Sequence, residues 1–184
     1  GVHYMNETWI LAADSVKITG AGMWYTKLQF TNSGMGTGGI CGEKTGYCQN
    51  VELCNMYINS NLHSRFDQQA NYKCFRDLFA KGTSIHDVWE EHFECGFWIG
   101  RYDSNSINKE SDLNIYNCRV RNNFADGINF CQGTRDSNVH NCDIRNNGDD
   151  GLAMWNATDF QPDDEYNNTF CYNTVEFIWR AGGI

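Results

Sequence analysis

The sequence predicts an all-β chain folded as a parallel β-helix, on the evidence of its turn-forming residues, an internal repeat and short stretches of alternating polarity. The 184 residues include 18 glycines but a single proline, Pro162. Gly, Asn and Asp must therefore form most of the turns, which favours an architecture of short strands and tight corners. The length suits one domain with a sizeable core, so we expect a single domain spanning residues 1–184.

The second observation is a repeat of 24 residues. Segment 117–128 aligns without a gap on segment 141–152, and both contain an Asn-Cys start, an Asn-Asn pair and an Asp-Gly pair. A fixed period of this size is typical of solenoids. Looser copies begin near residues 15, 50, 84 and 170. We expect each copy to form one coil that buries its inward side chains against its neighbours.

Short alternating stretches within each unit, such as 113–116 and 118–121, read as strands separated by Asn-Asn or Asp-Gly corners. Asn tolerates the left-handed backbone of a tight corner. We therefore expect Asn122 to stack on Asn146, and Asn123 on Asn147, as structural ladders, with sugar binding as the alternative role. Segments 34–46 and 66–81 do not fit the pattern, so we interpret them as loop insertions that leave the helix. Neither end contains a capping element, which suggests part of a longer protein.

Charge and cysteine content narrow the possible functions. The formal net charge is −9 and no stripe of Lys and Arg occurs, which argues against nucleic-acid binding. No run approaches the roughly 18 apolar residues of a membrane span. The nine cysteines show no paired CxxC spacing, so we expect no zinc site. Disulfides or buried thiols both remain possible, including for Cys118 and Cys142, which occupy equivalent repeat positions.

Three N-glycosylation sequons start at Asn6, Asn156 and Asn167. With the cysteines, they lead us to expect a secreted, extracellular glycoprotein with disulfide bonds.

The repeat brings acidic residues together. Asp126 and Asp150 occupy the same position in consecutive units, with Asp149 beside them. Because stacked coils lie about 4.8 Å apart, these carboxyl groups should share one face, and like charges held close raise at least one pKa. Glycoside hydrolysis needs a protonated acid and a second carboxylate. The same residues could instead be simple Asp-Gly corners or ligands of a structural calcium ion, although no EF-hand loop is present.

Several motifs resemble one known family. Segments 124–129 and 145–155, with the flanking segments 20–25, 91–98, 173–175 and 181–184, are similar to glycoside hydrolase family 87, the α-1,3-glucanases, mutanases and mycodextranases. The resemblance implies a right-handed parallel β-helix of the pectate-lyase-like kind. It also implies cleavage of α-1,3-glucosidic bonds with inversion, using Asp126, Asp149 and Asp150 without an organic cofactor. It does not assign the acid and the base among the three.

Candidate substrate-binding residues accompany these acids. An indole ring can stack on the apolar face of a sugar, although core packing is the alternative for each tryptophan. Trp98 and Trp155 follow the motifs closely, and Trp89 and Trp179 are weaker candidates. His92 is a candidate by its neighbourhood. Arg145, in register with Arg121, could position a carboxylate or a sugar hydroxyl.

The leading hypothesis is a secreted, endo-acting hydrolase of an α-glucan polysaccharide. The alternative is a non-catalytic extracellular β-helix that serves as a structural, carbohydrate-binding or adhesion module. A polysaccharide lyase is a third possibility, which would require a basic residue at the site and would release an unsaturated, ultraviolet-absorbing product.

Overall fold

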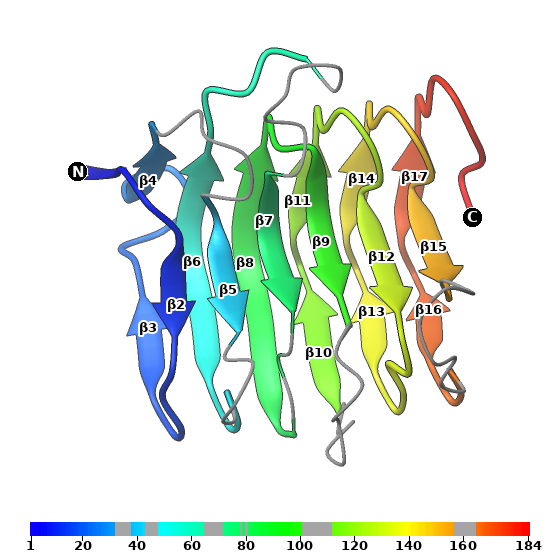
Figure 1. The fold of residues 1–184 in the computed structure, drawn as a ribbon, viewed down its shortest axis with the longest axis horizontal. Coiled ribbons are helices and arrows are strands. Elements are labelled where there is room, and N and C mark those ends of the chain that lie inside the picture. Colours follow the sequence, from blue (N-terminus) through cyan, green and yellow to red (C-terminus); the bar gives the residue numbers. More distant parts are fainter. Residues whose placement is uncertain are drawn as a thin grey trace.

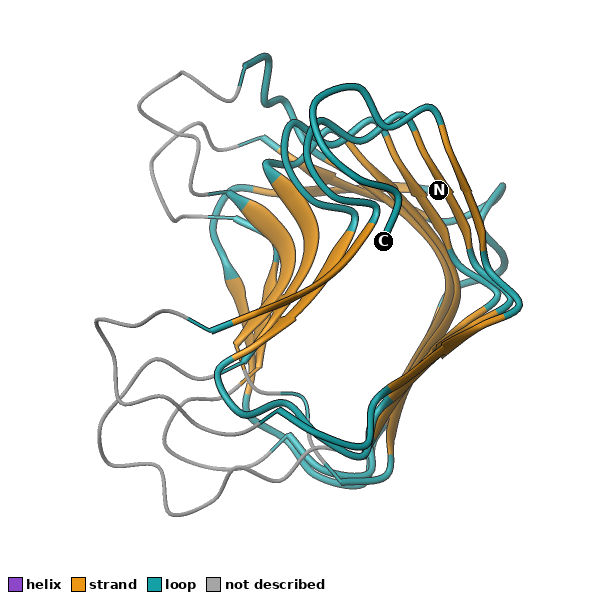
Figure 2. Ribbon diagram, turned by 90° about the vertical axis from the view of Figure 1, so that its right-hand side faces the viewer, coloured by secondary structure: helices purple, strands orange, loops and turns teal. Residues whose placement is uncertain are grey.

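The computed structural model describes residues 1–31, 38–42, 48–64, 72–77, 79, 81–100, 112–156 and 165–184. These residues form a right-handed parallel β-helix, in which the chain winds from one end of the molecule to the other and every strand pairing is parallel (Figure 1). A view along the helix axis shows the strands as walls around a closed interior (Figure 2). No helix among the described residues could cross a membrane, since none is long and apolar enough.

Two sheets make up the walls. Sheet A contains β1 (Val2–Met5), β3 (Lys17–Thr19), β4 (Lys27–Phe30), β6 (Glu52–Asn59), β8 (Thr83–Glu91), β10 (Leu113–Tyr116), β11 (Arg119–Arg121), β13 (Asn138–His140), β14 (Asp143–Arg145), β16 (Thr169–Cys171) and β17 (Thr174–Glu176). Sheet B contains β2 (Trp9–Leu11), β5 (Ile40–Gly42), β7 (Lys73–Asp77), β9 (Cys95–Ile99), β12 (Ile128–Cys131) and β15 (Leu152–Trp155).

The 24-residue period is confirmed by the strand register. Asn114 pairs with Asn138, and Ile128 pairs with Leu152, so one full coil separates residues 24 positions apart. Upstream coils are longer, as in the pairing of Glu52 with Ser84. The looser sequence copies therefore also correspond to stacked coils, lengthened by extra residues at the corners.

Left-handed residues form rows at the corners of the helix. Asn117 and Asn141 have φ of 54° and 56° and lie in one row, and Asn122 and Asn146 have φ of 57° and 60° and lie in another. Asn tolerates this conformation better than most residues. The Asn146 Nδ2 donates to Asn122 Oδ1 at 2.9 Å. The predicted exposed ladder is confirmed.

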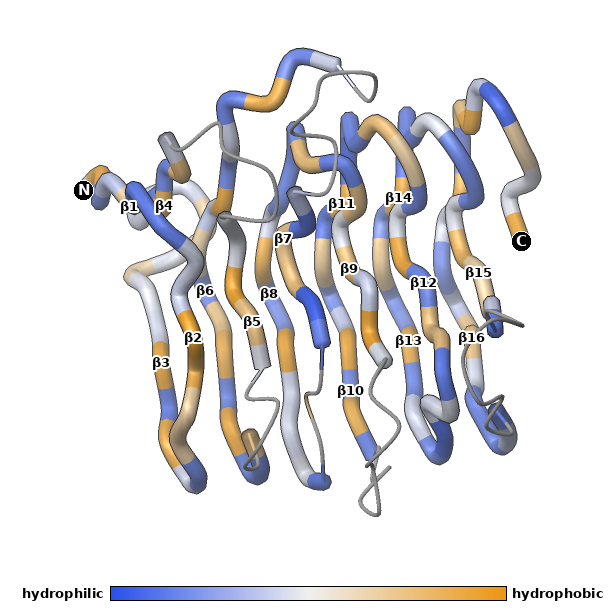
Figure 3. The backbone as a smooth tube through the Cα atoms, viewed as in Figure 1, coloured by the Kyte–Doolittle hydropathy of each residue, from blue (hydrophilic) through white to orange (hydrophobic). Residues whose placement is uncertain are grey.

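The interior is filled by stacked apolar side chains. Hydrophobic and hydrophilic residues alternate along many strands (Figure 3), which turns every second side chain inward. Leu53, Ile85 and Ile115 follow one another in register and are fully buried. Phe75 and Phe97 stack with ring centroids 4.6 Å apart. Coil-to-coil stacking of this kind supplies the apolar contacts that hold the solenoid together.

Glu90 interrupts this apolar interior. It lies in register between Ile58 and Val120, and it is fully buried. Its Oε1 accepts from Asn123 Nδ2 at 2.8 Å, and Asn123 Nδ2 also donates to Asn147 Oδ1 at 3.0 Å. The predicted Asn123–Asn147 ladder is thus present, inside the helix. Burial raises the pKa of Glu90 well above its usual value, so the carboxyl group keeps its proton to higher pH than an exposed glutamate.

The two predicted loop insertions are partly wrong. Segment 34–46 contains β5, which pairs with β2 and β7, and segment 66–81 contains β7, which pairs with β5 and β9. Gly39 explains why the first segment can join the sheet, because a Cβ at that position would lie 1.9 Å from the Lys73 carbonyl oxygen. Its abundance of glycine therefore reflects close packing as well as turns. Residues 32–37, 43–47, 65–71, 78 and 80 of these regions and their surroundings lie outside the described residues.

The expectation of disulfides is also corrected. All nine cysteines are free thiols, and eight of them are buried. Cys118 and Cys142 stack on consecutive coils as small, buried side chains that contact each other through their sulfur atoms. Free cysteine behaves as a small apolar residue, which suits a repeated inward position.

Candidate active site

A cleft of about 360 Å³ lies on the outer surface of sheet B. Its walls come from three consecutive coils, through β9, β12, β15 and the corners that precede β12 and β15. The lining residues are Glu94, Trp98, Ala125, Asp126, Asn129, Asp149, Asp150, Ala153, Met154 and Trp155.

Stacking of two corners brings the three predicted acids together at this cleft. Asp126 precedes β12 and Asp150 precedes β15, and the Gly127 amide donates to the Asp150 carbonyl at 2.9 Å across the two coils. A carboxyl oxygen from each of Asp126, Asp149 and Asp150 lies within 4.8 Å of the others. The sequence prediction that these acids share one outer wall is therefore correct.

The three carboxyl groups differ in their surroundings. Asp126 is 7% exposed, whereas Asp149 and Asp150 are half-buried. Asp126 Oδ2 accepts from Asn129 Nδ2 at 2.9 Å, and its Oδ1 accepts from the Asp150 backbone amide at 3.2 Å. Asp150 Oδ1 accepts from the Gly182 amide at 3.0 Å. One buried carboxyl group thus lies beside two that reach solvent.

Burial raises the pKa of Asp126 above its ordinary value, and the negative charges of Asp149 and Asp150 raise it further. The hydrogen bonds from Asn129 and from the Asp150 amide act in the opposite direction, because they favour the ionised form. Burial is the largest of these effects. Asp126 consequently retains a proton to higher pH than an exposed aspartate, which is the property required of a general acid.

Two tryptophans flank the acids. The Trp98 and Trp155 ring centroids lie 5.5 Å apart with the ring planes tilted by 54°, and Trp155 is 46% exposed. The Lys73 ammonium lies 4.9 Å from the centre of the Trp98 ring and pairs with Glu94 at 2.7 Å. The cleft therefore offers carboxyl groups next to aromatic surface, an arrangement suited to an uncharged sugar chain.

Three residues at or beside the cleft were missed by the sequence reasoning. Glu94 and Asn129 lie inside the motif segments 91–98 and 124–129. The motifs therefore indicate this region of the chain, but they do not single out these two residues. Lys73 lies in segment 66–81, which the sequence pattern predicts to be a loop. Its contact with Glu94 depends on the pairing of β7 with β9, which a sequence period alone does not indicate.

His92 and Arg145 do not line the cleft, so the structure does not bring these two predicted substrate-binding residues to the site. His92 occupies a left-handed corner with φ of 64°, and its Nδ1 lies 2.8 Å from Asn59 Oδ1. Arg145 lies on β14 of sheet A and forms ion pairs with Asp143 and Glu176. Its predicted register with Arg121 is correct, and the carboxylate that both arginines contact is Asp143. Both residues therefore make contacts within the fold, and a role in substrate binding stays a prediction.

The two weaker tryptophan candidates also lie elsewhere. Trp89 belongs to β8 on sheet A and packs against Trp24 and Tyr57, with ring centroids 5.0 Å away in each case. Trp179 is exposed near the last coil and does not line the cleft. Neither contributes to the candidate site.

The acidic cluster could also hold a cation. Three carboxyl groups within 4.8 Å supply part of the roughly six to eight oxygen ligands that Ca²⁺ takes. The remaining ligands would be other protein oxygens, water or substrate hydroxyls. A structural calcium ion here remains a prediction.

Comparisons with known proteins agree with this architecture. The family described as the α-1,3-glucanase catalytic domain D2 matches residues 1–183. The crystal structure of the Agl-KA catalytic domain is 44% identical, with a TM-score of 0.90, and the match covers 100% of this chain and 32% of that one. A variant GH87 α-1,3-glucanase catalytic domain in complex with tetrasaccharides is 26% identical, with a TM-score of 0.75 over 91% of this chain and 28% of that one.

A third structure bears on the fold alone. The catalytic unit of a thermostable GH87 α-1,3-glucanase from Streptomyces thermodiastaticus strain HF3-3 is 22% identical, with a TM-score of 0.61 over 92% of this chain and 30% of that one. No curated protein matches the chain in sequence.

The fold and the cleft together define a glycoside hydrolase domain of the parallel β-helix class. Within that class, the chain belongs to the family of α-1,3-glucanase catalytic domains, in which it corresponds to part D2. It spans about a third of the length of the solved catalytic domains that it matches.

Proposed function

We propose that the protein containing this chain hydrolyses α-1,3-glucosidic bonds in a polysaccharide by carboxylate acid–base catalysis. The observation that carries the proposal is the convergence of Asp126, Asp149 and Asp150 within 4.8 Å in a cleft lined by two tryptophans. Family membership supports the linkage, since the matched structures are α-1,3-glucanases and two are described as complexes with nigerose.

Asp126 is the proton donor in this proposal. Its burial and raised pKa suit a group that must deliver a proton to the leaving glycosidic oxygen. Asp149 and Asp150 are more exposed, and one of them would act as the base that activates water. The Gly182 amide bonded to Asp150 Oδ1 would hold that carboxylate in place.

The course of the cleft supports endo-action on a chain. Trp98, Asn129 and Ala153 occupy the same register position on three successive coils, so a glucan can lie along the helix axis and cross the acids. Trp98 and Trp155 would stack on sugar rings on this path. A polysaccharide substrate is insoluble or too large to enter cells, which supports an extracellular location.

The test is an activity assay on the full polypeptide with α-1,3-glucan. Asp126→Asn, Asp149→Asn and Asp150→Asn are compared with wild type by the release of reducing ends. Removal of the general acid should lower kcat by about 100- to 10,000-fold, and removal of the base should have a similar effect. Asp112→Asn is the matched control, because Asp112 is an exposed corner carboxylate that caps the Gly82 amide outside the cleft. It should retain full activity.

The products of the same assay decide the finer points. Proton NMR of the first product reports the anomer, and β-product would establish inversion. The carboxyl oxygens approach more closely than the roughly 6.5 to 9.5 Å usual for inverting pairs, so inversion is supported by the family resemblance and not by this spacing. Oligosaccharides of mixed length at early times would establish endo-action.

Three outcomes would contradict the proposal. A wild-type protein that binds α-1,3-glucan without releasing reducing ends would be a carbohydrate-binding module. An ultraviolet-absorbing unsaturated product would indicate a lyase. Full activity in all three cleft variants would place the catalytic centre elsewhere.

A further inference from the structure

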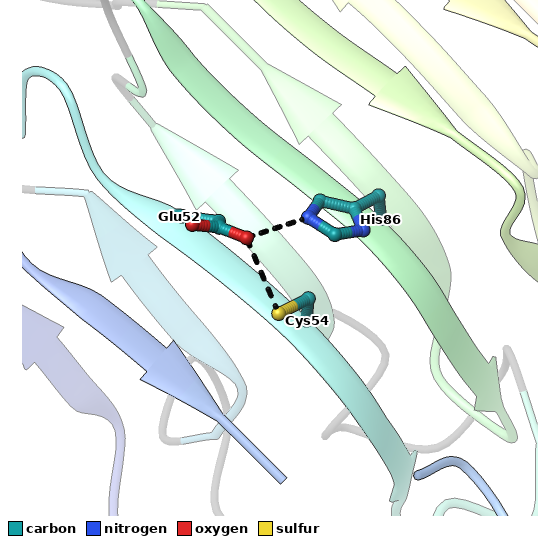
Figure 4. A group of neighbouring side chains, drawn as sticks. All are labelled: Glu52, Cys54 and His86. Atoms are coloured by element: carbon teal, nitrogen blue, oxygen red, sulfur yellow. Dashed lines mark hydrogen bonds and ion pairs between the residues drawn. The ribbon is translucent and has the colours of Figure 1, made fainter.

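A second cluster of reactive side chains lies on sheet A, apart from the cleft. Glu52 and Cys54 are two residues apart on β6 and project from the same side of the strand, and His86 is the register partner of Cys54 on β8 (Figure 4). One ligand atom from each of the three lies within 4.8 Å of the others. Carboxylate, thiolate and imidazole are the three side-chain types that bind Zn²⁺ in proteins.

The separations match a tetrahedral ion. Zn–N and Zn–O bonds of about 2.0 Å and a Zn–S bond of about 2.3 Å place nitrogen and oxygen about 3.3 Å apart, and sulfur and oxygen about 3.5 Å apart. His86 Nε2 lies 3.1 Å from Glu52 Oε1, and Cys54 Sγ lies 3.7 Å from the same oxygen. An ion could therefore enter with side-chain shifts of a few tenths of an ångström.

The histidine is already oriented for coordination. His86 Nδ1 lies 2.7 Å from Asp87 Oδ2, so Nδ1 can keep its proton when Nε2 exchanges its hydrogen bond to Glu52 Oε1 for a bond to a metal ion. This carboxylate–histidine arrangement commonly supports a metal-bound imidazole. The ring plane is also fixed, because Tyr116 stacks on His86 with centroids 4.6 Å apart and planes 6° apart.

The thiol is prepared in a similar way. Cys54 is fully buried, and Asn55 Nδ2 donates to its Sγ at 3.3 Å, while Thr19 Oγ1 lies 3.4 Å away. Both neighbours can donate hydrogen bonds to a thiolate. The cation that now faces Glu52 is Lys17, whose Nζ lies 2.7 Å from Glu52 Oε1. The Lys17 side chain is 56% exposed, so it can move into solvent at little cost when an ion takes its place.

We propose that Glu52, Cys54 and His86 form a binding site for a zinc-type divalent cation. Sulfur and imidazole ligands select Zn²⁺ over Ca²⁺ and Mg²⁺, and the fourth position would be filled by water. The ion would join β6 to β8 and thereby tie two neighbouring coils together. The ligands of this site are brought together by the stacking of coils and not by a CxxC motif. A search of the sequence for CxxC spacing therefore does not reveal it.

The test is titration of the chelator-treated, reduced protein with Zn²⁺, followed by calorimetry, and with Co²⁺, followed by absorption. Wild type should bind one ion with a sulfur-to-cobalt charge-transfer band. The band shows that a thiolate binds the ion and excludes a site made of the carboxylates of Asp126, Asp149 and Asp150, and its loss in the Cys54 variant assigns it to Cys54. Cys54→Ser should abolish the band and His86→Gln should weaken binding severely. Asp87→Asn should weaken it by about 10- to 100-fold.

Two further variants keep the test informative if a ligand variant unfolds. Lys17→Met should tighten binding, because it removes the competing ammonium group, and a folding defect cannot produce that gain. Cys171→Ser is the matched control, since Cys171 is a partly exposed thiol in register with His140 on the same sheet. It should leave the band unchanged. No charge-transfer band in wild type, a band lost only in Cys171→Ser, or unchanged affinity in Lys17→Met would overturn the proposal.

Discussion

Asp126 and Glu90 are both buried carboxyl groups, and their neighbours give them different roles. Asp126 opens onto the cleft and receives two hydrogen bonds. Glu90 lies in the apolar interior, where one oxygen accepts from Asn123 and the other has no partner among the described residues. The first group can exchange its proton with a substrate, whereas the second is enclosed and holds its proton to higher pH than an exposed glutamate.

Asn129 should tune the pH dependence of activity. Its amide donates to Asp126 and favours the ionised form, so Asn129→Ala should raise the pKa of Asp126. Because the general acid must be protonated, activity falls as pH rises through that pKa. The alkaline limb of kcat/KM should therefore move to higher pH in Asn129→Ala, and it should not move in Asn114→Ala, which lies on sheet A. A shift to lower pH would exclude Asp126 as the acid.

Glu90 should make the stability of the protein depend on pH. Its pKa is higher in the folded state than in the unfolded chain, where it is about 4.3. Above the unfolded-state pKa, the unfolded chain releases the Glu90 proton while the folded protein still keeps it. The free energy of unfolding therefore falls as pH rises above that pKa.

Glu90→Gln keeps the acceptor for Asn123 and removes this proton linkage. It should be more stable than wild type, by a margin that grows as pH rises above about 5 in urea unfolding from pH 5 to pH 9. A margin that is constant over this range would show that Glu90 is not protonated in the folded state.

At the level of the structural element, the corners are what the sequence predicts best. Asn-Asn and Asp-Gly pairs require left-handed backbone or tight turns, and both recur at a fixed spacing, so the ladders of Asn122 and Asn123 and the juxtaposition of Asp126 and Asp150 could be predicted. Strands β5 and β7 could not, because glycine and long connections also occur in loops. Their place in sheet B depends on pairing with strands from other coils.

Asn146 allows the energetic cost of the left-handed corner conformation to be measured. Asn146→Ala loses the hydrogen bond to Asn122 and forces alanine into a left-handed conformation, which costs roughly 1 to 2 kcal/mol. Asn138→Ala is the matched control, because it loses the similar ladder bond to Asn114 within a strand. Urea unfolding should show the larger destabilisation for Asn146→Ala, and Asn146→Gly should recover most of it. Equal losses in the two alanine variants would contradict a backbone origin.

At the level of the whole molecule, both candidate sites arise because consecutive coils stack in register. The cleft and the Glu52–Cys54–His86 cluster each combine residues from consecutive coils, on sheet B and sheet A respectively. The cleft could be predicted because its coils are separated by the regular 24 residues. The second cluster could not, because residues 54 and 86 are joined through a longer coil. His92 and Arg145 lie inside the motif segments 91–98 and 145–155, but neither side chain lines the cleft.

The burial of eight thiols without a disulfide determines how the protein responds to oxidants and reductants. In the native fold few thiols are accessible to oxidants, and there is no disulfide for a reductant to cleave. The stability of the fold should therefore not depend on the redox state of its surroundings. Once the coils come apart, nine sulfhydryl groups become reactive together. Oxidation then cross-links the unfolded chains, so that unfolding which was reversible becomes irreversible.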